Sequence, residues 1–498
     1  MRALIVSVVA LAVAGSHARA DDQIPFEKAE RLTLDDLLKV AVRVAPELEA
    51  AAFDVAVARA NRQVAEGVTN WVAAASANTT ISKLPAATNS SLDTQVVVSK
   101  LLPTNGVVAI GADVSQQAHT EPRATNKFTT IDLSLSVKQP LLAGGGVAIR
   151  DSQIRATQHA MSAATIRRFA SARAFVADLA EAYWRLALAW RRLDVLHLSL
   201  DAAEKQLATI QRGLQSGAIA KSEALPFAQS IASRKIDIAN AENDIVAQSL
   251  ALRTLVGLEI PPDAPVVRTI DLPRADAITI DTADLVRKAL ATSDELNAAL
   301  EDARGAEAGV SAARRNLLPT LDLTLTGDIT STHQTFSQAL DELRYTRGYS
   351  LVAGATFSLP VGRDAVRGAF AATRANLARA RFDVQTARKS IAATVVGLAS
   401  QAKTSARTVE LSGQVVTLAQ QNVEAEQRKF ELGKSTSNEV VRRQNELESA
   451  RLQLESASAD ATIALTRLEA MSGQILQHYG IKMTDPDQIT GAELDQRP

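Results

Sequence analysis

The chain has 498 residues, of which 46% are hydrophobic and 22% charged, which is enough for a large packed core or for several domains. Its formal net charge of −1 argues against a nucleic-acid-binding protein, because such proteins usually carry a strong basic excess. The sequence has no cysteine, which excludes disulfides and thiolate chemistry.

The first twenty residues have the pattern of a secretory signal peptide. Arg2 precedes an apolar run over 3–15, and an A-x-A cleavage site follows at 18–20. We therefore expect residues 1–20 to be removed and the mature chain to begin at Asp21. The run is shorter than the ~20 apolar residues of a membrane-spanning helix. No later stretch of the sequence has enough consecutive apolar residues to form such a helix. Entry into a membrane would therefore require strands.

The rest of the chain repeats one order of elements twice: short helix, strands, long helix, turn, long helix. Each repeat opens with a helical pattern, over 34–69 in the first and 283–316 in the second. A connector rich in proline separates the repeats and is expected to be irregular. The predicted organisation is a first repeat over 21–257, a linker over 258–282, a second repeat over 283–473 and a tail over 474–498.

Strands are predicted where apolar and polar residues alternate, over 71–82, 130–138, 320–328 and 349–359. Their lengths suit the ~9–11 residues of a tilted membrane strand, although a half-buried sheet in a water-soluble protein gives the same pattern. A further pair, 93–101 and 107–116, is joined by an Asn-Gly turn and has no counterpart in the second repeat. We interpret this pair as an elaboration of an outer loop, and 330–347 as an ordinary loop.

Heptad repeats are the strongest pattern in the sequence. Apolar residues recur every seven positions along two long segments, 147–212 and 361–432, and along two return arms, 222–256 and 437–471. Such repeats predict antiparallel coiled-coil hairpins. Each long helix would reach ~100 Å and each return arm ~50 Å at 1.5 Å per residue. The remaining half of each long helix would then pack on the short helix of its repeat.

Four strands in one chain cannot close a membrane barrel, since the smallest barrels have about eight. An open sheet edge in lipid would leave backbone groups without partners. A chain that entered a membrane with four strands would therefore have to oligomerise, and three copies would supply twelve strands.

In the order of its motifs the chain resembles outer-membrane efflux proteins of the TolC type, over nearly all of the mature sequence. No single motif is specific, but their duplicated order behind a signal peptide is. One departure is Asn70-Trp71, which stands where the second repeat has Leu-Pro before its strand. The motifs are Pro46-Glu47-Leu48, Gln139-Pro140-Leu141-Leu142, Ala182-Tyr183-Trp184, Leu318-Pro319-Thr320-Leu321, Leu359-Pro360-Val361 and the two turns at Gly217 and Gly433.

The resemblance implies a mostly helical fold with a β-barrel part, in which a homotrimer shares one twelve-stranded barrel in the outer-membrane lipid and its helices form a periplasmic tunnel. It implies a passive channel of a tripartite efflux or type I secretion system. The partners would be a periplasmic adaptor protein and an inner-membrane pump or ABC exporter. No cofactor, no metal and no nucleic acid is expected.

The resemblance also assigns roles to particular residues. The expected periplasmic gate residues are Glu223, Glu439 and Arg442. Arg442 is hypothesised to pair with Glu223 or Glu439 across the tip. The alternative is that all three are solvated residues on the flank of the coiled coil. The expected adaptor-docking tips are Gly217, Ala218, Ile219, Gly433, Lys434 and Ser435. The expected strand-to-helix joints are Pro140, Gly144, Gly145, Gly146 and Pro360.

Two other classes of protein are alternatives to a channel. An enzyme is disfavoured because the six histidines are scattered and no nucleophile or carboxylate constellation recurs in the two repeats. A secreted periplasmic or surface coiled-coil structural protein would account for the signal peptide and the heptads. It would not account for strands set between helices in both repeats, and solubility without detergent would favour it.

Overall fold

A computed structural model of the chain describes residues 31–85, 87–121, 123–215, 220–258, 260, 266–271, 273, 280–345 and 348–481. The expected signal peptide, much of the expected linker and most of the expected tail lie outside these residues. The described residues divide into two compact units, and each unit takes segments from both sequence repeats. Unit 1 contains 31–49, 172–289 and 394–481, and unit 2 contains 50–171 and 290–393.

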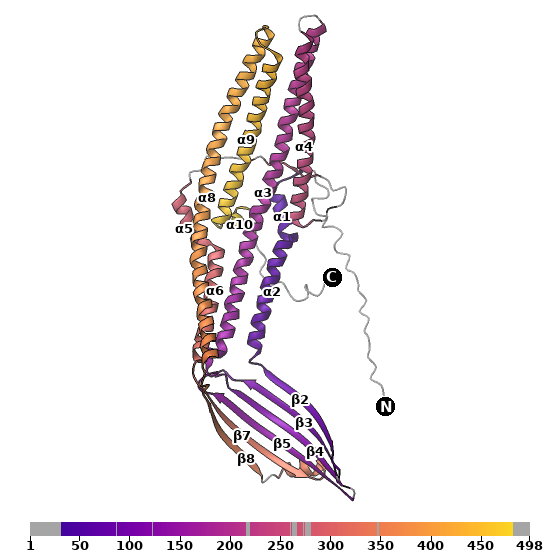
Figure 1. The fold of residues 1–498 in the computed structure, drawn as a ribbon, viewed down its shortest axis with the longest axis vertical. Helices are drawn as coiled ribbons and strands as arrows, with labels where there is room; N and C mark the ends of the chain where they lie inside the picture. The colour runs from indigo at the N-terminus through magenta and orange to yellow at the C-terminus, as the bar shows by residue number, and fades with distance from the viewer. Residues whose placement is uncertain are drawn as a thin grey trace. The chain divides into compact units, whose positions relative to one another are not determined.

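The predicted long helices and return arms are present (Figure 1). They are α3 (Val147–Gln215), α4 (Leu225–Val256), α8 (Asp364–Glu431) and α9 (Ser437–Met471), with a 3-10 turn, η2 (Lys221–Ala224), before α4. Heptad residues on these helices are buried, among them Ile238, Ile245 and Leu252 on α4. Many buried positions on α9 are alanine, which allows helix axes to approach closely. In the described part of the chain, no helix has both the length and the hydropathy needed to cross a membrane.

The two expected short helices are each broken into two, so the prediction of continuous helices over 34–69 and 283–316 is wrong. The first gives α1 (Leu34–Val44) and α2 (Pro46–Gly67), and the second gives α5 (Thr282–Thr292) and α6 (Asp294–Arg315). Ala45 has ψ 123°, as expected of a residue before proline. Ser293 has ψ 119° and its side chain accepts a hydrogen bond from the amide of Leu296, which starts α6.

Unit 2 contains one antiparallel sheet in the order β2-β3-β4-β5-β7-β8 (Figure 1). The strands are β2 (Trp71–Lys83), β3 (Thr88–Leu101), β4 (Val107–Glu121), β5 (Ala124–Pro140), β7 (Thr320–His333) and β8 (Tyr349–Ser358). The sheet therefore has six strands rather than the expected four. The additional pair, now β3 and β4, is paired along its length and lies between β2 and β5. Its interpretation as an outer-loop elaboration is wrong.

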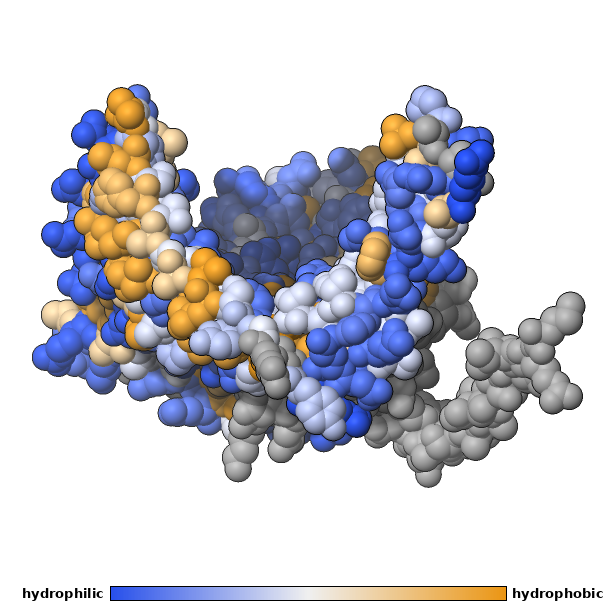
Figure 2. All heavy atoms as spheres, turned by 90° about the horizontal axis from the view of Figure 1, so that it is seen from below, coloured by the Kyte–Doolittle hydropathy of each residue, from blue (hydrophilic) through white to orange (hydrophobic). Residues whose placement is uncertain are grey.

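The strand register gives the sheet one apolar and one polar face. Cross-strand partners on the apolar face include Ala75, Val96, Ala112, Leu133 and Ile329. Large side chains on this face are exposed, as at Ile110 and Leu135. Seen from below, hydrophobic residues gather in patches beside hydrophilic ones (Figure 2). The opposite face carries polar residues, including Asp93, Asp113, Asp132 and Asp328.

The connection between β7 and β8 contains a helix, α7 (Phe336–Leu343), which corrects the expectation of an ordinary loop. The Thr335 side chain accepts a hydrogen bond from the amide of Gln338 and so starts the helix. Ala339 of α7 is fully buried, and α7 packs on β5 and β7. Ile131 and Ser331 are cross-strand partners on the apolar face and both are buried, which places α7 over that face.

In unit 1 a buried tyrosine ties the end of the linker to the start of the first repeat. β1 (Arg31–Leu32) pairs in parallel with β6 (Arg268–Thr269), so this end of the linker is not irregular. The Tyr183 hydroxyl lies 2.9 Å from the Asp271 carboxylate and 3.0 Å from the carbonyl oxygen of Leu32. The Asp271 carboxylate also accepts the amide hydrogen of Leu34 at 2.8 Å. Burial raises the pKa of the Tyr183 phenol, which therefore stays protonated.

We predict that Tyr183→Phe lowers the free energy of unfolding by about 1–2 kcal/mol, because the carboxylate of Asp271 loses a buried donor. Thermal unfolding followed by circular dichroism would measure the change. Tyr345→Phe is the matched control, since Tyr345 is 82% exposed. Equal melting temperatures for the two variants would contradict a stabilising role for the hydroxyl.

Candidate functional site

The turn between α8 and α9 is a glycine-terminated helix end. Gly433 has φ 69°, in the left-handed region that glycine adopts without strain. Its amide bonds the carbonyl oxygen of Phe430 at 2.9 Å, and the amide of Lys434 bonds that of Lys429 at 2.8 Å. This pair of bonds is a Schellman motif. In the other turn, Gly217, Ala218 and Ile219 lie outside the described residues.

Glu223 links the two hairpins at these turns. It lies in η2, and its carboxylate Oε2 accepts the amide hydrogen of Ser437, the first residue of α9, at 2.8 Å. Ser437 is only 2% exposed. A negative charge at a helix N-terminus is favourable, because the free amides there carry partial positive charge. Hydrogen bonds from the Ser437 hydroxyl and amide lower the pKa of the Glu223 carboxyl.

An apolar cluster joins the same two hairpins. Its buried members are Ile210 of α3, Phe227 of α4 and Val440 of α9. Partly buried side chains that surround it are Leu207, Leu214, Ala224, Phe430 and Val441. The two hairpins therefore meet through packed side chains from both sequence repeats. The hydrogen bond from Ser437 to Glu223 adds a polar contact between the same two hairpins.

Arg442 pairs with one of its two expected partners, Glu439, but along a single helix and not across the tip. Its guanidinium pairs with Glu439, three residues earlier on α9, and not across to the other hairpin. The side chains of Arg442 and Glu439 are 55% and 44% exposed. An exposed pair of this kind contributes little, ~0–1 kcal/mol. Of the three expected gate residues, Glu223 therefore joins the two hairpins, whereas Arg442 and Glu439 lie on the surface of α9.

Two polar contacts of the hairpins were missed by sequence reasoning. Glu426 of α8 accepts hydrogen bonds from Ser435 across the turn and from Lys429, and the Ser435 bond is the main cause of its lowered pKa. Arg234 of α4 is 3% exposed, and its Nε lies 3.0 Å from Glu448 Oε2 of α9. The i,i+3 spacing of Glu426 and Lys429 could have indicated their pairing. Arg234 and Glu448 lie far apart in the sequence and carry no local signal.

The strand-to-helix joint after β5 depends on its glycines. Pro140 ends β5. Gly144 and Gly146 have φ 81° and 99°, and a Cβ on Gly145 would collide with the carbonyl oxygen of Pro140. The amide of Gly144 donates to Asn316 Oδ1 at 3.3 Å. In the second repeat, Pro360 lies between the end of β8 and the start of α8.

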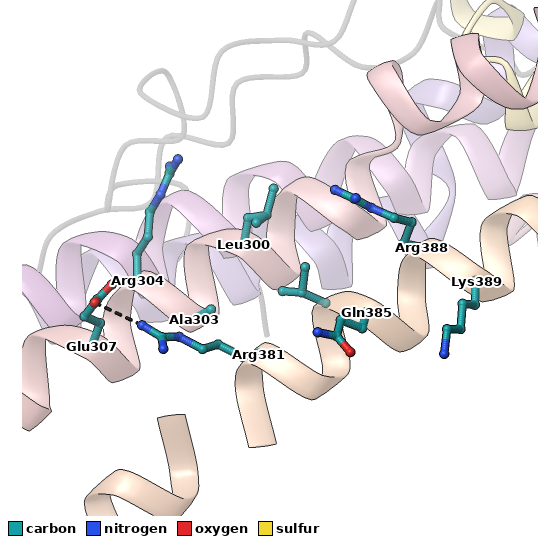
Figure 3. A pocket seen from close by; sticks show the side chains of 9 residues that line it. Leu300, Ala303, Arg304, Glu307, Arg381, Gln385, Arg388 and Lys389 are labelled. Atoms are coloured by element: carbon teal, nitrogen blue, oxygen red, sulfur yellow. Dashed lines mark hydrogen bonds and ion pairs between the residues drawn. The ribbon is translucent and has the colours of Figure 1, made fainter. Parts of the chain in front are cut away.

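Unit 2 also has an open groove of about 520 Å³ between α6 and α8 (Figure 3). Four basic side chains and one carboxylate are among its lining residues, and Arg381 lies 3.1 Å from Glu307. Across the described ranges, no group of three or more histidine, aspartate or glutamate side chains is arranged to hold a metal ion.

Comparison with known proteins identifies the relatives of the chain. The model of the family described as outer membrane efflux protein matches residues 37–258 and 285–474. The comparison with curated proteins gave no match. A membrane protein from Pseudomonas aeruginosa is similar in structure at 17% identity, with a TM-score of 0.68 over 88% of this chain and 93% of that chain.

Two further solved structures show the same fold. The outer membrane protein VceC from Vibrio cholerae has 16% identity and a TM-score of 0.65 over 88% of this chain and 96% of that chain. The outer membrane channel CmeC of Campylobacter jejuni has 13% identity and a TM-score of 0.65 over 91% of this chain and 88% of that chain. At such identities the likeness concerns the fold alone.

We predict that Gly145→Ala destabilises unit 2 by about 1–3 kcal/mol, because the added methyl group cannot fit beside Pro140 without backbone strain. Gly362→Ala is the control, since an added Cβ at Gly362 meets nothing within 4 Å. Thermal unfolding of the two variants in detergent would compare them. A melting temperature for Gly145→Ala as high as that for Gly362→Ala would contradict the close packing of the joint.

We also predict that the Glu223 contact is lost in acid. Its folded pKa is lowered, so its stabilisation is fully present above the ordinary pKa of 4.5 and disappears as the pH falls through the lowered value. Amide hydrogen exchange at Ser437, corrected for the intrinsic pH effect, should therefore speed up in that range. Glu223→Gln has no such titration, and an equal acid response in that variant would contradict the assignment.

Proposed function

Because the chain belongs to the outer membrane efflux protein family, we propose that it is the outer-membrane channel of a tripartite efflux or type I secretion system. In this role it is a passive conduit from the periplasm to the exterior. An inner-membrane pump or ABC exporter and a periplasmic adaptor deliver its substrates. The observation that best supports the proposal is a sheet with one exposed apolar face and one polar face, whose outer strands β2 and β8 each have one edge without a strand partner among the described residues.

The proposed assembly is a homotrimer with one shared barrel in the outer membrane. Neighbouring strands alternate in direction from β2 to β8, so β8 of one copy can pair in antiparallel fashion with β2 of the next. In unit 2, one side of α2 carries exposed apolar residues at helical spacing: Phe53, Val57, Val64 and Val68 just beyond its end. Such an exposed stripe suits packing against a helix of a neighbouring copy.

The tips of the helical hairpins are the proposed periplasmic end. We assign Glu223 the main role in holding this end shut, because its carboxylate joins η2 to the start of α9. Glu439 and Arg442 are lesser gate residues in this proposal, since they pair on one helix. The proposed adaptor contact comprises Gly433, Lys434 and Ser435 together with Gly217, Ala218 and Ile219.

Planar bilayers test the channel function directly. Protein that has been extracted in detergent and purified should form discrete pores in the bilayer. Their current should be steady and need no nucleotide, because the conduit itself does no work. A preparation that is folded by circular dichroism but forms no pores would contradict the proposal.

The same recordings test the gate. We predict that Glu223→Ala raises the open probability several-fold, because a contact of about 1 kcal/mol per copy is lost from the junction. Arg442→Ala on α9 is the matched control and should change the open probability by less than a factor of about two. Open probability unchanged by Glu223→Ala would remove Glu223 from the gate, and a large effect of Arg442→Ala would shift the role to that residue.

A further inference from the structure

We propose that β3 and β4 are membrane strands, so that three copies of this chain form an eighteen-stranded barrel with a lumen wider than twelve strands would enclose. The inference rests on the proposed trimeric channel and concerns the strands that build its wall. Three copies of a six-stranded sheet give eighteen strands, whereas the four strands expected from the sequence would give twelve.

The pairing of β3 and β4 is continuous with the rest of the sheet. β2 pairs with β3 from Trp71↔Lys100 to Lys83↔Thr88, and β4 pairs with β5 from Val107↔Lys138 to Glu121↔Ala124. Without the inserted pair, β2 and β5 would still run antiparallel. The hairpin has therefore been added between two strands without altering the direction of any other.

Both inserted strands also follow the two-sided pattern of their neighbours. Val96 and Val98 of β3 lie level with Ala112 and Ile110 of β4, on the face that carries Leu133 and Leu135 of β5. The alternate positions are mostly polar, such as Asp93 and Gln95. A hairpin in water needs no apolar face shared with four other strands, whereas a strand in lipid does. At the end of this face, the Lys100 ammonium lies 5.3 Å from the centre of the Trp71 ring. Lysine and tryptophan side chains both suit the interface between a membrane and water.

The turn between β3 and β4 is fixed to the strand-to-helix joint. Asn105 has φ 63°, and its side-chain amide donates to the carbonyl oxygen of Gly144. The amide of Gly146 donates to the carbonyl oxygen of Thr104 at 2.8 Å, and Gln139 Nε2 donates to the same oxygen at 3.2 Å. These bonds hold the inserted hairpin at the end of the sheet where β5 leads into α3. The hairpin is thus part of the frame of unit 2.

The physical consequence is a wider pore. An even number of strands per copy keeps every pair antiparallel when β8 of one copy meets β2 of the next. Barrel diameter grows about linearly with strand number, so eighteen strands give a barrel about one and a half times as wide as twelve. Barrels of 16–18 strands leave an open aqueous channel, whereas eight-stranded barrels are largely filled by side chains.

Single-cysteine variants test the position of β3 and β4, because the chain has no cysteine of its own. Val96→Cys and Ile110→Cys, labelled with a fluorophore in reconstituted vesicles, should be quenched by lipid-attached quenchers as strongly as Leu325→Cys on β7. Gln95→Cys and Ala109→Cys on the polar face should be quenched less. Lipid quenching at Leu325→Cys without any at Val96→Cys and Ile110→Cys would overturn the inference and leave the proposed channel intact.

A deletion tests the pore width. Lys83 and Thr125 lie level in the sheet, because Lys83 pairs with Thr88, Thr88 with Thr120 and Thr120 with Thr125. Removing residues 88–123 leaves five residues between Lys83 and Thr125, a length suited to a hairpin loop. In planar bilayers, the smallest poly(ethylene glycol) that the pore excludes would be measured for both proteins. This size limit should be clearly lower for the expected twelve-stranded trimer than for the full chain. Equal exclusion limits in two trimeric pores would overturn the inference. If the full chain formed no trimeric pores, the proposed function itself would be refuted. If only the deletion variant failed to assemble, the cysteine variants would decide the inference.

Discussion

The unsatisfied edges of the sheet are the constraint on which the rest of the structure depends. The outer edges of β2 and β8 have no strand partner within the described part of the chain, and one face of the sheet exposes large apolar side chains. In a lipid bilayer every backbone donor and acceptor must be satisfied, so such a sheet is viable there only when it closes with other copies. In the proposed trimer, the regular alternation of strand direction allows β8 of one copy to pair antiparallel with β2 of the next.

The helical hairpins of unit 1 follow a different rule, because they pack in water through heptad positions. Small residues on α9 allow close approach, and a few buried polar contacts fix which helices meet. The Arg234–Glu448 pair joins α4 to α9, and Glu223 joins η2 to the start of α9. Arg234 is 3% exposed, so loss of its partner would leave a buried charge without compensation, which is costly.

The sequence predicted the elements whose signals are local and periodic. The heptads gave the long helices and return arms, and the alternation gave all six strands as elements. The helix break at Ala45 could have been inferred from Pro46, whereas the break at Ser293 carries only a weak N-cap signal. The place of β3 and β4 in the sheet was missed because strand pairing is not local. For Arg442 the expected partner Glu439 was named, but the pair lies along one helix, and a pairing across the tip could not be told from it by sequence spacing alone.

The mass of the particle extracted from the outer membrane in mild detergent tests the central claim most directly, because closure of the sheet between copies is what the account requires. Light scattering with correction for bound detergent would give the protein mass. The account predicts three copies of the mature chain, stable only while detergent is present. A monomer or dimer that is released from the periplasm and stays soluble without detergent would contradict it.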